Sequence, residues 1–178
     1  MSQDRLPPHD DQAERAIIGC ALQDAAHAPE LRPEWFYDER YRIAADAILA
    51  LAAEGSPVNA ATVTQRLAGR NLPGAAQVIS ECDDACHSPA NFPYWRDILT
   101  EKKTLRRMIQ TAQTAIADAH GADRDGSNPA EVLDAYERDV LAIAHGLNGG
   151  GNAEVDIKAA LLELTDEYEQ AATQGKPR

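Results

Sequence analysis

Apolar residues recur at helical spacing along most of the chain, and no segment shows the strict apolar–polar alternation of a β-strand. In the first half the apolar faces are short and interrupted by prolines. We predict a helix that begins near Asp11, a second over about residues 39–54, and two short helices around Val63 and Val78. Asp11 and Glu14 have capping-box spacing, in which two side chains satisfy N–H groups at a helix start.

Aromatic residues are concentrated between the first two predicted helices. Trp35, Phe36 and Tyr37 follow one another there, and we expect them to fill the core of a compact helical lobe over residues 11–90. Residues 1–10 would form a tail in front of it.

The second half has a longer and more regular pattern. From Trp95 onward, apolar positions alternate in steps of three and four for about four heptads, which is typical of a helix packed against another helix. A second such stretch follows Asn128 and Pro129, an N-cap residue and a proline at the first helical position. We predict an antiparallel hairpin over residues 91–147, with a polar loop over 121–127. The helix–helix and dimer interface would consist of Ile98, Leu105, Ile109, Ile116, Leu133, Tyr136, Val140 and Ile143.

The end of the chain contains a linker and an isolated helix. Residues 148–154 are rich in glycine, and residues 155–178 hold an amphipathic helix and a short tail. A single narrow apolar stripe on an isolated helix normally docks on another surface. The docking residues would be Ile157, Leu161, Leu164 and Tyr168. The predicted fold class is therefore all-α: a lobe and a hairpin that together span 11–147, then a linker and an isolated amphipathic helix.

Composition excludes several classes of protein. The 178 residues include 17 Lys and Arg against 29 Asp and Glu, a net charge of −12 that disfavours broad, non-specific binding to phosphate backbones. No stretch approaches the roughly 20 apolar residues of a membrane span, and the acidic N-terminus is not a secretory signal. Three cysteines are too few for a disulfide framework. We expect a cytoplasmic protein without a membrane partner.

Candidate chemistry is sparse. No G-x-x-x-x-G-K-[ST] motif occurs, so we predict no enzyme activity and no cofactor for this chain. The candidate metal ligands are Cys82, Cys86 and His87, but their spacing matches no common zinc finger, and we interpret the thiols as small semi-buried apolar groups. A metal- or thiol-based sensor is the alternative.

One basic cluster remains, formed by Lys102, Lys103, Arg106 and Arg107. It could contact DNA or an acidic partner, or it could be a solvated face balanced by acidic neighbours.

The order of four segments resembles the N-terminal domain of DnaB-type replicative DNA helicases. They are residues 7–19 (PPHDDQAERAIIG), 36–43 (FYDERYRI), 55–62 (GSPVNAAT) and 88–91 (SPAN), the last leading to Lys102 and Arg107. The chain departs from the usual family pattern at Tyr41, at Asn59 and around Gly74, which suggests a divergent or phage-like member.

The resemblance implies a function. Such domains dimerise through their hairpins, assemble as a trimer of dimers into a collar of the hexamer, and dock primase or a helicase loader. ATP and Mg²⁺ would belong to an ATPase domain outside this chain, and single-stranded DNA would be bound by the parent protein. The terminal helix would pack on a neighbouring subunit. The alternative is a free-standing helical regulator that binds a helicase ring without an ATPase of its own; a reading frame that continues past Arg178 into a Walker A motif would distinguish the two.

Overall fold

Helices account for nearly all regular structure in the computed structural model, which describes residues 6–69, 72–126 and 128–148. No residue in these ranges lies in a β-strand, so the predicted all-α class is confirmed. The elements, in chain order, are α1 (Asp11–Gln23), η1 (Ala25–Glu30), η2 (Pro33–Trp35), α2 (Glu39–Ala53), α3 (Ala60–Ala68), α4 (Ala75–Ala85), η3 (Pro89–Asn91), α5 (Phe92–Asp125) and α6 (Pro129–Asn148), the η elements being short 3₁₀ helices. The chain divides into two units, one ending at Thr114 and the other beginning at Ala115.

Helix starts follow capping chemistry, with one correction. Asn59 caps α3: its side chain accepts the N–H of Thr62 while the Thr62 hydroxyl accepts the N–H of Asn59. The cap of α1, however, is Asp10, whose carboxylate accepts the N–H of Ala13 at 2.9 Å. The predicted capping box of Asp11 and Glu14 is therefore wrong, because Glu14 is buried and bonds elsewhere.

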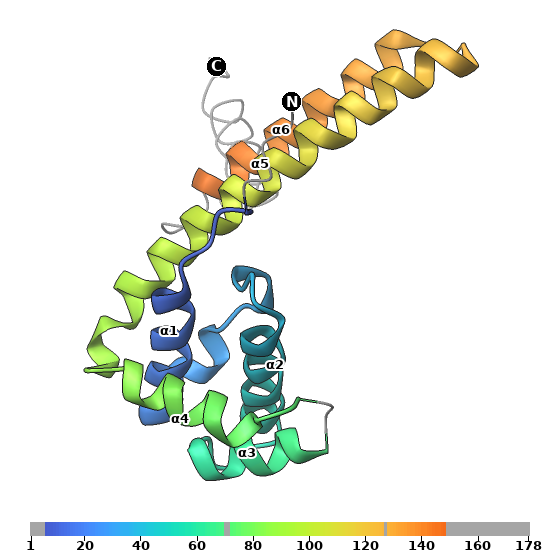
Figure 1. Ribbon diagram of the computed structural model, residues 1–178. Coiled ribbons are helices and arrows are strands. Elements are labelled where there is room, and N and C mark those ends of the chain that lie inside the picture. Colours follow the sequence, from blue (N-terminus) through green and yellow to red (C-terminus); the bar gives the residue numbers. More distant parts are fainter. Residues whose placement is uncertain (1–5, 70–71, 127, 149–178) are drawn as a thin grey trace, which may run out of the picture. The chain divides into compact units, whose positions relative to one another are not determined.

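The first unit is built around α1 (Figure 1). α1 packs most extensively against α4 and also contacts α2, and α3 packs against both α2 and α4. The core between them holds Ile17, Ile18, Ile48, Val63 and Ile79, and these apolar side chains provide the main stabilisation of the unit.

The aromatic run before α2 enters the core only in part. Trp35 and Phe36 are buried, as expected. Tyr37 is 40 % exposed, so its predicted core position is wrong. Its ring stacks on the ring of His9, with centroids 4.7 Å apart.

α1 and α4 approach one another unusually closely at Gly19. A Cβ atom at this position would lie 2.1 Å from the carbonyl oxygen of Cys82 and 2.7 Å from the Cβ of Cys86. Only glycine allows two helices to pack at this distance.

The first helix of the predicted hairpin is present but extends further than expected. α5 runs 34 residues and continues to Asp125, so most of the predicted polar loop over 121–127 is helical. Gly126, with φ of 76°, ends the helix in a conformation that favours glycine. Asn128 caps α6 by accepting the N–H of Ala130 at 3.1 Å. The predicted linker (148–154) and terminal helix (155–172) lie outside the described residues, apart from Asn148 at the end of α6.

Candidate interaction surface

α5 is anchored on the first unit by apolar residues in its first two turns. Phe92 is 1 % exposed and stacks on His27, with ring centroids 4.4 Å apart. Leu99 is completely buried, and Ile98 packs against the same core from the edge. Leu99 therefore belongs to the core and is not available for contact with another chain.

A polar cluster forms a second anchor of α5, about two turns beyond Leu99. The guanidinium of Arg106 donates to the backbone oxygens of Pro8 at 2.8 Å and Trp35 at 2.6 Å, with a longer bond to the oxygen of Glu34. A guanidinium has five N–H donors in a rigid fork, which suits it to hold several carbonyls together. Arg106 therefore connects α5 to both the segment before α1 and the segment before α2.

Glu14 lies at the centre of this cluster. It is the only buried charged residue in the described part of the chain, and its carboxylate accepts the N–H groups of Tyr37 at 2.9 Å and Asp38 at 3.1 Å. Burial raises the pKa of Glu14 above its usual value, while the two N–H donors and the charge of Arg106 act in the opposite direction. Glu14 is thus a structural acceptor that fixes the start of α2.

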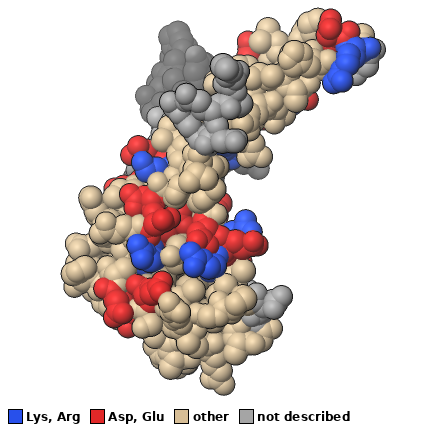
Figure 2. Space-filling view, viewed as in Figure 1, with Lys and Arg blue, Asp and Glu red and all other residues tan. Residues whose placement is uncertain are grey.

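The four residues of the basic cluster have different roles. Arg106 is committed to backbone carbonyls, and Lys103 forms an ion pair with Glu34 at 3.2 Å. Lys102 is partly exposed and Arg107 is exposed, and within the described ranges no ion pair is recorded for either. On the visible face of the molecule, acidic and basic side chains gather together rather than in separate areas (Figure 2).

Within the first unit, α5 also exposes large apolar side chains. Leu105, Met108 and Ile109 are between 37 % and 51 % exposed. The predicted pattern therefore marks a real apolar stripe, but in this unit the stripe contacts solvent.

The second unit also exposes large apolar side chains. Ile116 on α5 is 60 % exposed, and so, in part, are several large apolar residues of α6: Leu133, Tyr136, Val140 and Leu141. Ile143 alone of the predicted interface residues on α6 is buried. Near the turn, the two helices border a cavity of about 410 Å³, lined by Ala119, Ala122, Asp123, Pro129 and Val132, and another of about 370 Å³. Alanine is the most frequent residue in the lining of these two cavities.

This arrangement suits contact with another protein chain. Exposed large apolar side chains grouped on a helix face cost free energy in water and are typical of an interaction surface. We name as the apolar face the exposed residues of the second unit, Ile116, Leu133, Tyr136 and Val140. The first unit has a cavity of about 620 Å³, lined by Leu6, Pro7, Pro8, Tyr37, Arg106, Ile109, Gln110 and Gln113.

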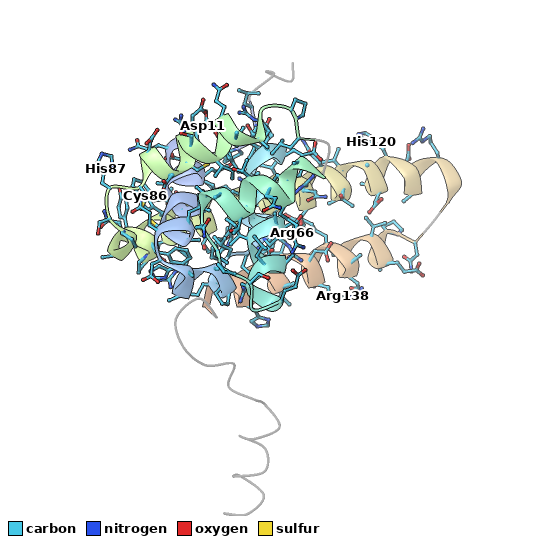
Figure 3. All side chains as sticks on the ribbon, turned by 90° about the horizontal axis from the view of Figure 1, so that it is seen from below. Asp11, Arg66, Cys86, His87, His120 and Arg138 are labelled. Carbon is cyan, nitrogen blue, oxygen red and sulfur yellow. The ribbon has the colours of Figure 1, made fainter. Side chains whose placement is uncertain are left out.

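The candidate metal ligands are not brought together. Cys82 and Cys86 are buried, whereas His87 is exposed at the edge of the first unit beside Cys86 (Figure 3). No group of three or more His, Cys, Asp or Glu side chains among the described residues could hold a metal ion. The candidates Ile157, Leu161, Leu164 and Tyr168 lie outside the described residues.

Sequence reasoning missed the Glu14–Arg106 cluster. Glu14 had the spacing of a cap and Arg106 belonged to a row of cations, so both had an ordinary local explanation. The only available signal was the position of Glu14 among alanines and isoleucines that are otherwise buried.

The described part of the chain thus defines an all-helical domain with several exposed large apolar side chains. No helix within it is long and apolar enough to cross a membrane. Residues 6–101 match the family model described as the DnaB-like helicase N terminal domain. The chain belongs to this family.

Known relatives agree with this assignment. The chain is 31 % identical to the replicative DNA helicase DnaC of Bacillus subtilis and 32 % identical to DnaB of Geobacillus stearothermophilus, with 96 % and 95 % of this chain covered. It spans only 38 % of the length of each of these relatives.

Solved structures show the same fold. The crystal structure of the N-terminal domain of DnaB helicase from Mycobacterium tuberculosis matches with a TM-score of 0.68 and 30 % identity, over 76 % of this chain and 99 % of that one. A DnaB-like replicative helicase, whose structure was described together with its interactions with primase, matches with a TM-score of 0.60 and 20 % identity. The match covers 90 % of this chain and 35 % of the helicase chain.

Proposed function

We propose that this chain is the non-catalytic assembly and recruitment domain of a replicative DNA helicase. Two copies pair through the apolar face, dimers assemble into the collar of a hexamer, and the collar docks primase or a loader. ATP hydrolysis, Mg²⁺ binding and movement along single-stranded DNA belong to the remainder of the parent helicase.

The observation that carries this proposal is the exposure of the apolar face. Ile116 is 60 % exposed, Leu133 55 % and Val140 41 %, although the sequence places all three at the spacing of a helix–helix interface. Each such side chain would contribute about 1 kcal/mol if a partner removed its exposed surface from water. A second copy presents the same stripe and can bury it symmetrically.

The recruitment function is supported by the relatives. The similar DnaB-like helicase is described with its interactions with primase, and the chain corresponds to about a third of its length. Family membership and the shared fold make the same class of partner the first to test for this chain.

Light scattering coupled to gel filtration tests the pairing. We expect the chain to be dimeric or larger, and the double variant Ile116→Asp/Val140→Asp to be monomeric with an unchanged far-ultraviolet circular dichroism spectrum, because both residues are already partly in solvent. Tyr94→Asp is the matched control: Tyr94 is 61 % exposed on α5 but lies outside the apolar face, so this variant stays paired.

A wild-type chain that stays monomeric at the highest attainable concentration would refute the pairing. Recruitment is tested separately by calorimetric titration of the wild-type chain with purified primase from the same organism. Absence of heat at concentrations where the chain is paired would refute that part alone.

A further inference from the structure

Two cysteines far apart in sequence meet inside the first unit. Cys20, on α1, and Cys86, directly after α4, have their sulfur atoms 3.2 Å apart, and 66 positions separate them along the chain. Both residues are buried, Cys20 completely and Cys86 with 6 % of its surface exposed. The sequence patterns grouped Cys86 with Cys82 and His87, but the structure gives it a different neighbour.

The surrounding contacts hold the two sulfur atoms in place. The thiol of Cys86 donates to the sulfur of Cys20, and the thiol of Cys20 donates to the backbone oxygen of Ser88 at 3.7 Å. The close approach of the two helices at Gly19 brings the Cβ of Cys86 over α1. A disulfide requires the sulfurs to come to about 2.05 Å, so a movement of little more than 1 Å closes the bond.

Cys86 lies where such a movement is feasible. It is the C-cap residue of α4, with extended backbone angles; its N–H donates to the oxygen of Asp83, and its own carbonyl accepts from the side chain of Gln23 at 3.1 Å. Cys20, by contrast, is inside α1. One sulfur is therefore carried by a regular helix and the other by extended backbone at a helix end.

We propose that Cys20 and Cys86 form a reversible internal disulfide when the protein meets hydrogen peroxide. The Cys86 thiol attacks one peroxide oxygen, which gives a sulfenic acid and releases one water. The Cys20 sulfur then attacks the sulfenic sulfur; the S–S bond forms, the S–O bond breaks, and the leaving hydroxide takes the Cys20 proton as a second water. Two thiols are oxidised and one peroxide is reduced to two waters.

The order of attack follows from the environments of the two sulfurs. Burial, reinforced by the neighbouring Cys86, raises the pKa of Cys20 to about 12, so this thiol is a poor first nucleophile. Its contact with Cys86 makes it an effective second one, since the sulfenic sulfur forms beside it. Burial raises the pKa of Cys82 to about 12 as well, and no contact between its sulfur and either of the other two is recorded among the described residues.

The bond would tie the end of α1 to the segment that leads through η3 into α5. It would close most of the first unit into one covalent loop and limit the conformations of its unfolded state. We expect the oxidised chain to melt roughly 5–15 °C higher than the reduced chain. A dithiol reductant would reverse the shift.

Peptide mapping of the full chain tests the proposal. The native protein is treated with hydrogen peroxide, remaining thiols are alkylated, and the protein is digested without reduction. Because Cys82 and Cys86 share one tryptic peptide, cleavage before Asp83 and Asp84 is added to separate them. We expect a cross-linked Cys20–Cys86 species, with Cys82 alkylated, and its loss after reduction.

Two variants make the result specific. Cys82→Ser should form the same disulfide and show the same rise in melting temperature, and Cys86→Ser should show neither. Oxidation of Cys86 to sulfinic acid without a cross-link, a disulfide that involves Cys82, or three unmodified thiols would each overturn the proposal. Mapping of the wild-type protein is decisive by itself if Cys86→Ser fails to fold.

Discussion

The contact between α1 and α4 at Gly19 leads to a sharp mutational prediction. Gly19→Ala adds one methyl group, and this group would lie 2.1 Å from a backbone oxygen of α4. That distance is far inside van der Waals contact, and the obstacle is a backbone atom rather than the mobile end of a side chain. The two helices must therefore separate, or α4 must shift along α1.

Two opposing effects set the magnitude. Alanine is the better helix former, and replacing glycine in a helix interior stabilises it by about 1 kcal/mol. Overpacking a filled core typically costs 1–3 kcal/mol, and separating the most extensive helix pair of the unit belongs at about the upper end of that range. We therefore expect Gly19→Ala to lower the free energy of unfolding by about 2 kcal/mol.

Urea unfolding followed by tryptophan fluorescence measures this change. Both tryptophans, Trp35 and Trp95, lie in the first unit and report on its unfolding. Gly121→Ala in α5 is the control, because a Cβ there meets nothing within 4 Å and the fluorescence transition should not move to lower urea. A Gly19→Ala protein that is unchanged, or stabilised by the amount helix propensity alone provides, would refute the close approach.

Two further predictions concern the Glu14–Arg106 cluster. Burial raises the pKa of Glu14 above its usual 4.5, so the folded state binds this proton more tightly than the unfolded state; the contribution to stability is largest below pH 4.5 and is lost as the pH rises through the raised pKa. The difference in unfolding free energy between wild type and Glu14→Gln should therefore shrink as the pH increases from 4.5. A constant or growing difference in urea titrations would contradict the assignment. Arg106→Ala should destabilise the first unit by about 3 kcal/mol, because three backbone oxygens lose a charged donor. Arg107→Ala is the control and should stay within about 0.5 kcal/mol of wild type. Equal urea midpoints for the two variants would show that the hydrogen bonds of Arg106 contribute nothing to stability.

Local structure could be predicted well from the sequence because its signals are local. Asn59 and Asn128 mark helix starts through their own side chains, and the apolar spacing over residues 39–54 defines the buried side of α2. Such features depend on neighbours three or four positions away, and the printed chain contains them in full.

Tertiary partners could not be predicted in the same way. A three-four spacing shows that one side of a helix is apolar, but it does not show whether that side meets the core, another helix or another chain. Leu99 and Ile116 are both apolar and both on α5, yet one is completely buried and the other is 60 % exposed. Glu14 shows the same limit for polar residues, since its partners Tyr37 and Asp38 are set by packing.

The intramolecular contacts of Lys103 and Arg106 determine how many cations of the basic cluster could contact the phosphates of a nucleic acid. Each phosphate neutralised by a cation releases condensed counterions, and for a single strand the logarithm of affinity falls with the logarithm of salt by about 0.7 per contact. With Arg106 bonded to backbone oxygens and Lys103 to Glu34, the cluster has Lys102 and Arg107 left to offer a passing strand. Two contacts would give a slope of only about −1.4, and residues five positions apart do not share a helix face, so a strand that reached both would be held only loosely.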